Sequence, residues 1–182
     1  DAKAYYERRH YTTIITMQNM LDNCVWLYMR SKELNVTLSP TIMFAILEKT
    51  KELYSKIGYS VIWDIQCYWH SMLLRGNDPQ YIGNQSNQQL YGMNLWDRTA
   101  EVNDNRLSAA NVDANAKILY SEYFYNSSIK NQGMQLIEYK WEREIVEVVT
   151  VMQNKIQNLV SEKGISIECC PTSNLKIGYI DK

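Results

Sequence analysis

The sequence predicts a mainly α-helical protein, a bundle of about five helices with one short strand close to the C-terminal end. Two observations carry this prediction. Apolar residues recur every three or four positions along most of the 182 residues, which places them on one side of a helix. After Gly164 the pattern changes to alternating apolar and polar residues, which is typical of a strand.

The first two helices are expected over about 4–30 and 40–57. Ser39 supplies an N-cap side chain, and Pro40 occupies the first helical position, where its missing N–H costs nothing. Gly58 is a residue type that commonly ends a helix. The apolar stripe of the first helix consists of Ile14, Met17, Leu21, Val25 and Tyr28.

A third helix is expected over about 61–75. It is apolar over a wide arc and ends at Gly76, so most of it should be buried. Residues 77–106 are rich in Asn, Gln, Gly and Asp and show no periodicity, which predicts a long polar loop. A fourth helix, capped by Ser108, should run to about Asn126.

The clearest periodicity predicts a fifth helix over about 132–163, ending at Gly164. A strand should follow over 165–170 and stop at Pro171. The chain would therefore consist of a helical domain, 1–163, and a terminal strand and loop, 164–182, which belong to a larger fold.

Composition excludes several classes of protein. The net charge is −1, and a sequence-independent nucleic-acid binder needs a surplus of Lys and Arg, so no nucleic-acid partner is expected. No apolar run approaches the length of a membrane span, so no membrane partner is expected. The four cysteines form no Cys-x-x-Cys pair, which favours free thiols in a reducing, cytoplasmic compartment. These cysteines are Cys24, Cys67, Cys169 and Cys170.

The most specific motif follows the expected C-terminal strand. Residues 168–174 read Glu-Cys-Cys-Pro-Thr-Ser-Asn, and Gly178 follows. Thr172, Ser173 and Asn174 would lie just past the carboxyl end of the strand, where ligands bind in parallel α/β folds. The same side chains would also serve a simple turn by capping local backbone groups.

Residues 164–178 resemble the adenosine deaminase-like branch of the metal-dependent amidohydrolases, in which a Glu-x-Cys-Pro-Thr-Ser-Asn stretch with a later glycine recurs. The resemblance implies a (β/α)8 barrel in the parent protein. It also implies a zinc-activated water that attacks a purine carbon and releases ammonia. Thr172, Ser173, Asn174 and Gly178 would belong to the loop at the mouth of that active site.

The chain departs from this family in its metal ligands. The family uses a His-x-His pair, two further histidines and an aspartate, whereas this chain has only His10 and His70, in other contexts. We therefore expect no catalytic residue, no metal ligand and no bound cofactor in this segment, and zinc in the full-length parent. The isolated segment should be inactive, and its helices resemble, more weakly, the insertions of a deaminase-like subunit of bacterial antiphage defence assemblies.

Two other interpretations stay open. The chain could be a stand-alone helical domain for protein–protein interaction or oligomerisation, without catalysis. Alternatively, the polar loop could act as a lid over a nucleotide or a partner. The expected partners are the rest of the parent barrel, further copies of the chain bound through its helices, and a purine nucleoside or nucleotide for the parent. Cys67 and His70, three positions apart, could pair as a nucleophile and a base, but core packing is the preferred explanation.

Overall fold

The computed structural model describes residues 12–75 and 105–165 of the chain. These residues form seven helices and one two-stranded antiparallel sheet, so the mainly helical prediction is confirmed for the described part. The elements, in chain order, are β1 (Thr12–Thr16), α2 (Met17–Glu33), α3 (Pro40–Ile57), α4 (Ile65–Leu74), α7 (Asn105–Val112), α8 (Ala114–Tyr125), α9 (Ser127–Gly133), β2 (Leu136–Lys140) and α10 (Arg143–Glu162).

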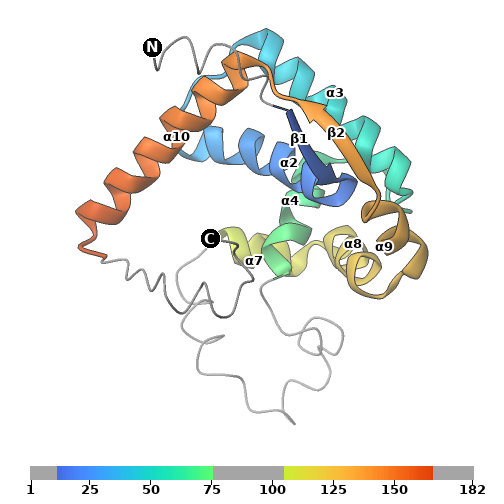
Figure 1. Cartoon of the computed structure of the whole chain (residues 1–182). Helices are drawn as coiled ribbons and strands as arrows, with labels where there is room; N and C mark the ends of the chain where they lie inside the picture. The colour runs from blue at the N-terminus through green and yellow to red at the C-terminus, as the bar shows by residue number, and fades with distance from the viewer. Residues whose placement is uncertain (1–11, 76–104, 166–182) are drawn as a thin grey trace, which may run out of the picture.

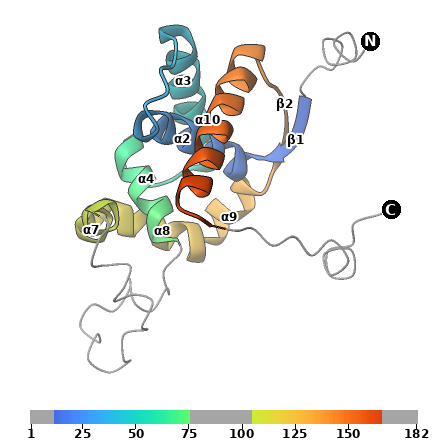
Figure 2. The ribbon, with the colours of Figure 1, turned by 90° about the vertical axis from the view of Figure 1, so that its left-hand side faces the viewer.

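Helix α2 lies at the centre of the fold. It packs against α3 and α4, while the β1–β2 ribbon, α9 and α10 surround the rest of it (Figure 1). Met20, Leu21 and Val25 on α2 are fully buried, and they meet Tyr68 of α4 and Met152 of α10 in one continuous core. Figure 2 shows α10 crossing in front of α2. None of the helices in the described ranges combines the length and apolar character that crossing a bilayer requires.

Helix α3 matches its prediction closely because its boundary signals are local. The Ser39 side chain accepts a hydrogen bond from the Ile42 N–H, and Pro40 opens the first turn. Gly58 ends the helix with φ +86°, a left-handed conformation that glycine adopts without a steric penalty. The third expected helix is α4, which begins later than expected because the Asp64 side chain caps it.

The predicted first helix, 4–30, is wrong at its start. Residues 12–16 form the strand β1, and the helix begins only at Met17, where the Thr16 side chain caps it. Thr and Ile are β-branched and fit a pleated strand better than a helix. The part of the expected helix before Thr12 lies outside the described residues.

The predicted fifth helix, 132–163, is also wrong in its first third. The chain ends α9 at Gly133, forms β2 and starts α10 at Arg143. Ile137, Tyr139 and Trp141 recur every second position, as in a strand, although Ile137 and Trp141 alone are also four apart, as in a helix. Hydrogen bonding to β1 selects the strand. In that pairing Ile15 lies opposite Ile137, and Thr12 lies opposite Lys140.

The remaining differences concern boundaries. The expected fourth helix is two helices, α7 and α8, because the Asp113 side chain starts a new helix by accepting from the Ala116 N–H. Helix α7 starts at Asn105, so the expected polar loop ends two residues early, and residues 77–104 lie outside the description. Ile165 is not in a strand, and the rest of the expected strand 165–170 is likewise not described.

Candidate functional site

The motif residues Thr172, Ser173, Asn174 and Gly178 lie outside the described residues, and the structure describes only the helix that leads to them. The end of α10 is a Schellman motif. The Gly164 N–H donates to the Ser161 carbonyl at 2.9 Å, and the Ile165 N–H donates to the Val160 carbonyl at 3.1 Å. Gly164 has φ +65°, so the predicted helix end at this glycine is confirmed.

Cys67 and His70 do not form the direct pair that their spacing allowed. Both instead contact Asp113, across the interface between α4 and α8. The His70 Nδ1 lies 2.8 Å from Asp113 Oδ2, and the Cys67 Sγ lies 3.9 Å from Asp113 Oδ1. Because the Gln66 amide nitrogen donates to His70 Nε2 at 2.9 Å, the ring proton lies on Nδ1 and is donated to Asp113.

The electrostatics of this cluster oppose nucleophilic chemistry at Cys67. Burial and the nearby negative charges of Asp113 and Asp64 raise the pKa of the Cys67 thiol to about 12. Burial alone would raise the pKa of Asp113, but hydrogen bonds from the Ala116 N–H and His70 bring that pKa below its ordinary value. A protonated thiol beside an ionised carboxylate is a poor nucleophile, so the cluster joins α4 to α8 rather than forming a catalytic site.

A second polar cluster is buried where α2, α4 and α8 meet. Arg75 Nη1 donates to Asp22 Oδ2 at 2.6 Å, and the Tyr68 hydroxyl donates to Asp22 Oδ1 at 2.7 Å. Gln18 completes the cluster, because its Nε2 lies 2.6 Å from the Tyr68 hydroxyl and its Oε1 accepts from the Tyr59 hydroxyl at 2.7 Å. Sequence patterns do not reveal these residues, since a lone acidic residue on an apolar helix carries no sign of its distant partner.

Burial dominates the titration of this cluster. It raises the pKa of Tyr68 well above the ordinary value, although the charge of Arg75 acts in the opposite direction. It also raises the pKa of Tyr59 to about 12. Both hydroxyls therefore remain protonated hydrogen-bond donors over the physiological pH range. The cluster holds the start of α2 against the end of α4, directly before residue 76.

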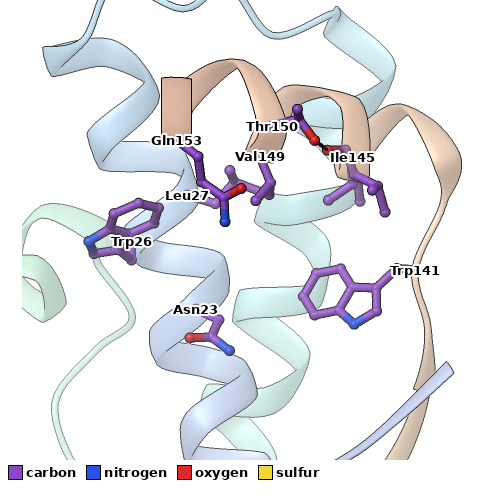
Figure 3. A pocket seen from close by; sticks show the side chains of 9 residues that line it. Asn23, Trp26, Leu27, Trp141, Ile145, Val149, Thr150 and Gln153 are labelled. Carbon is purple, nitrogen blue, oxygen red and sulfur yellow. Dashed lines mark hydrogen bonds between the residues drawn. The ribbon is translucent and has the colours of Figure 1, made fainter. Parts of the chain in front are cut away.

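An apolar groove of about 420 Å³ lies between α2 and α10 (Figure 3). Trp26 of α2 and Trp141, which precedes α10, lie on opposite sides of it, and Leu27 and Ile145 form its buried floor. The polar residues that line the groove are uncharged. The Thr150 hydroxyl donates a hydrogen bond to the Val146 carbonyl at 2.9 Å. The full lining consists of Asn23, Trp26, Leu27, Trp141, Ile145, Val146, Val149, Thr150 and Gln153.

The groove could not be predicted from the sequence. The fifth helix expected over 132–163 includes Trp141, whereas in the structure Trp141 follows β2 and turns toward α2 from the far side of the groove. The volume of the groove falls in the range of small-molecule sites. Helices α2 and α10 both contribute apolar side chains to it, which makes the groove a candidate binding surface.

The described residues contain no ligand set for the zinc that the family resemblance implies. No group of three or more His, Cys, Asp or Glu side chains there could hold a metal ion. His70 is already engaged by Asp113 and Gln66, while His10, Cys169 and Cys170 lie outside the description. The described residues therefore do not fit a zinc centre, and the expectation that this segment binds no zinc stays a prediction.

Comparison with protein-family models, curated proteins and solved structures finds no match to this chain.

Proposed function

We propose that the chain is part of a zinc-dependent, adenosine deaminase-like hydrolase acting on a purine nucleoside or nucleotide. In this proposal residues 164–178 enter the catalytic barrel, and the helical region acts in assembly. The observation that carries the proposal is the order of elements around the motif. Helix α10 ends at a left-handed Gly164, and the Glu-Cys-Cys-Pro-Thr-Ser-Asn stretch begins four residues later.

The described residues contribute rigidity rather than chemistry in this proposal. Helix α10 is anchored by Ile145 and Met152, which are both buried against the core. Lys155 Nζ donates to the Leu34 and Asn35 carbonyls at 3.0 and 3.1 Å. These contacts hold α10 at the C-terminal end of α2, and α10 in turn fixes where residue 164 starts the segment that carries the motif.

The flanking gene sequence and an activity assay test this proposal. In the family that the motif resembles, a His-Pro element and an Asp-Asp strand follow the Pro-Thr-Ser-Asn stretch. We therefore expect these two elements downstream and a His-x-His pair upstream. The complete zinc-loaded protein should release ammonia from adenosine or AMP, and residues 1–182 alone should not. In the complete protein, Asn174→Ala should lower kcat/KM by about tenfold or more through loss of a hydrogen bond at the active-site mouth.

A matched control is Asn158→Ala, which changes the same residue type on the exposed side of α10 and should leave kcat/KM unchanged. A complete zinc-loaded protein that releases no ammonia from any purine nucleoside or nucleotide would contradict the proposal. Turnover by residues 1–182 alone would contradict the expectation that the metal ligands lie elsewhere.

The groove between α2 and α10 favours a second candidate function, a helical domain for protein–protein interaction without catalysis. Apolar residues on α10 stay exposed beyond the groove, as Leu159 is 44% exposed. Such a surface is typical of helices that bind a partner. Self-association of a protein that lacks deaminase activity would support this candidate over the first.

A further inference from the structure

We propose that α10 is a dimerisation helix that packs antiparallel against α10 of a second copy of this chain, across a two-fold axis. The inference deepens the assembly role proposed above and does not depend on deaminase chemistry. The N-terminal half of α10 lines the groove with α2, and the C-terminal half carries a continuation of the same apolar stripe. Each half would cover the opposite half of the partner's helix.

Burial along α10 leaves this stripe partly uncovered. Ile145 and Met152 are buried, whereas Ile156 and Val160 are only half-buried and Leu159 is exposed. In Figure 1 the C-terminal turns of α10 extend past the end of α2, away from α3 and the β1–β2 ribbon. Apolar side chains in that position gain free energy when a further surface covers them.

The stripe is complementary to itself when α10 is reversed. The centre of the helix falls between Met152 and Gln153. Ile145 and Val160 lie at equal distances from this centre, as do Val149 and Ile156. An antiparallel pair of α10 helices therefore places Val160 of the partner over Ile145, and Ile156 of the partner over Val149, in the groove.

The charges at the two ends of α10 have the same reversed symmetry. Glu142 and Lys163 lie at equal distances from the centre of the helix, and both fall on the side of α10 that carries Ile145 and Val160. Both side chains are exposed. Antiparallel packing brings opposite charges together at both ends, and it also aligns the two helix dipoles favourably. A parallel pair would instead place like charges opposite each other.

This charge pattern identifies a second copy as the occupant of the groove. An isologous interface needs a surface that is complementary to itself. Helix α10 supplies the apolar stripe that enters the partner's groove, and it also forms one wall of the groove that receives the partner's stripe. The groove contains no ionisable side chain, so an apolar helix face can enter it without leaving a charge unpaired.

The first test is the mass of residues 1–182 in solution, measured by analytical ultracentrifugation over a wide range of concentration. We expect a reversible dimer. Ile156→Glu should raise the dimer dissociation constant by about a hundredfold, because each dimer would bury two carboxylates among apolar side chains. The matched control is Val151→Glu, at an exposed apolar residue on the opposite side of α10, which should leave the constant unchanged.

Val160→Glu, close to the end of α10, repeats the test at a position where the fold depends less on the side chain. Circular dichroism of each variant is the check that it is folded. A wild-type chain that remains monomeric at all concentrations would overturn the inference. So would a folded Ile156→Glu or Val160→Glu variant that dimerises as tightly as the wild type.

Charge reversal tests the antiparallel geometry itself. Glu142→Lys and Lys163→Glu should each weaken their own homodimer by about tenfold, because like charges then meet at both ends. An equal mixture of these two variants should restore wild-type affinity, because a mixed dimer has opposite charges at both ends. Failure of the mixture to dimerise more tightly than either variant alone would overturn the antiparallel arrangement.

Discussion

Arg75 and Asp22 form a buried ion pair, with 2.6 Å between Arg75 Nη1 and Asp22 Oδ2, although 53 positions separate them in the chain. The two side chains are only 13% and 20% exposed. The Arg75 guanidinium also lies 3.8 Å from the ring centroid of Tyr123, so one cation connects α2, the end of α4 and α8. Removing either partner would leave the other charge poorly solvated.

We expect Arg75→Met to lower the free energy of unfolding by about 3 kcal/mol, because the Asp22 carboxylate would lose its cation in a buried site. Denaturation by urea measures this change. The double variant Asp22→Asn, Arg75→Met should recover part of the loss, since no unpaired charge remains. Arg143→Met is the matched control. It breaks an exposed pair with Glu147 and should cost no more than about 0.5 kcal/mol. Equal losses of unfolding free energy for Arg75→Met and Arg143→Met would contradict the prediction that burial makes the Arg75–Asp22 pair the more important one.

Asp113 should make the stability of the fold depend on acid pH. Its pKa in the folded chain is lowered below the ordinary value of 3.8. The contribution of Asp113 to the free energy of unfolding is therefore fully present above pH 3.8. It is lost as the pH falls through the lower pKa of the folded state. Asp113→Asn keeps a capping oxygen but cannot ionise. We expect its unfolding free energy to fall less steeply than that of the wild type in this acid range, and parallel profiles would contradict this prediction.

Cys24 and Cys67 should resist alkylation until the chain unfolds. Burial raises the pKa of each thiol to about 12, and both cysteines are free. Because only the thiolate reacts, labelling at pH 8 should be about a thousandfold slower than for a free cysteine. Peptide mapping by mass spectrometry after iodoacetamide treatment follows each site separately. Rapid labelling of Cys67 in the folded chain would show that the Cys67–His70–Asp113 cluster activates the thiol after all.

Gly164 should tolerate substitution only by residues that accept a left-handed conformation. Within the described ranges, no atom beyond the adjacent residues and the local helix backbone lies within 4 Å of the position that a Cβ would take, so the cost of Gly164→Ala comes from the backbone conformation. We expect Gly164→Ala to lower the free energy of unfolding by about 1 kcal/mol, measured by thermal unfolding. Gly164→Asn should cost less, because asparagine adopts positive φ more readily. An alanine variant as stable as the wild type would contradict this account of the helix end.

Lys155 should hold the C-terminal half of α10 on the end of α2. Lys155→Met would remove both hydrogen bonds to the Leu34 and Asn35 carbonyls and a cation near the C-terminal end of the α2 dipole. We expect a loss of about 1 kcal/mol and faster hydrogen exchange in α10 after Met152. Lys155→Arg should restore most of the protection. Unchanged exchange in the methionine variant would show that apolar contacts alone hold this half of α10.

Elements whose signals are local follow from the sequence alone. Ser39, Pro40 and Gly58 set the two ends of α3, and Gly164 set the end of α10, because caps and left-handed glycines act within one turn of the backbone. The motif at 168–178 was likewise found by sequence alone, and its role stays a proposal.

Elements and contacts that depend on a distant partner follow only from the packing of the chain. Thr12–Thr16 and Leu136–Lys140 became strands because each supplies the other's backbone hydrogen bonds, which no local pattern announces. For the same reason Trp141, which lies within the helix expected over 132–163, lines the α2–α10 groove after β2 instead. The Asp22–Arg75 pair was equally hidden, since its stability depends on burial that only the packing of α2, α4 and α8 creates.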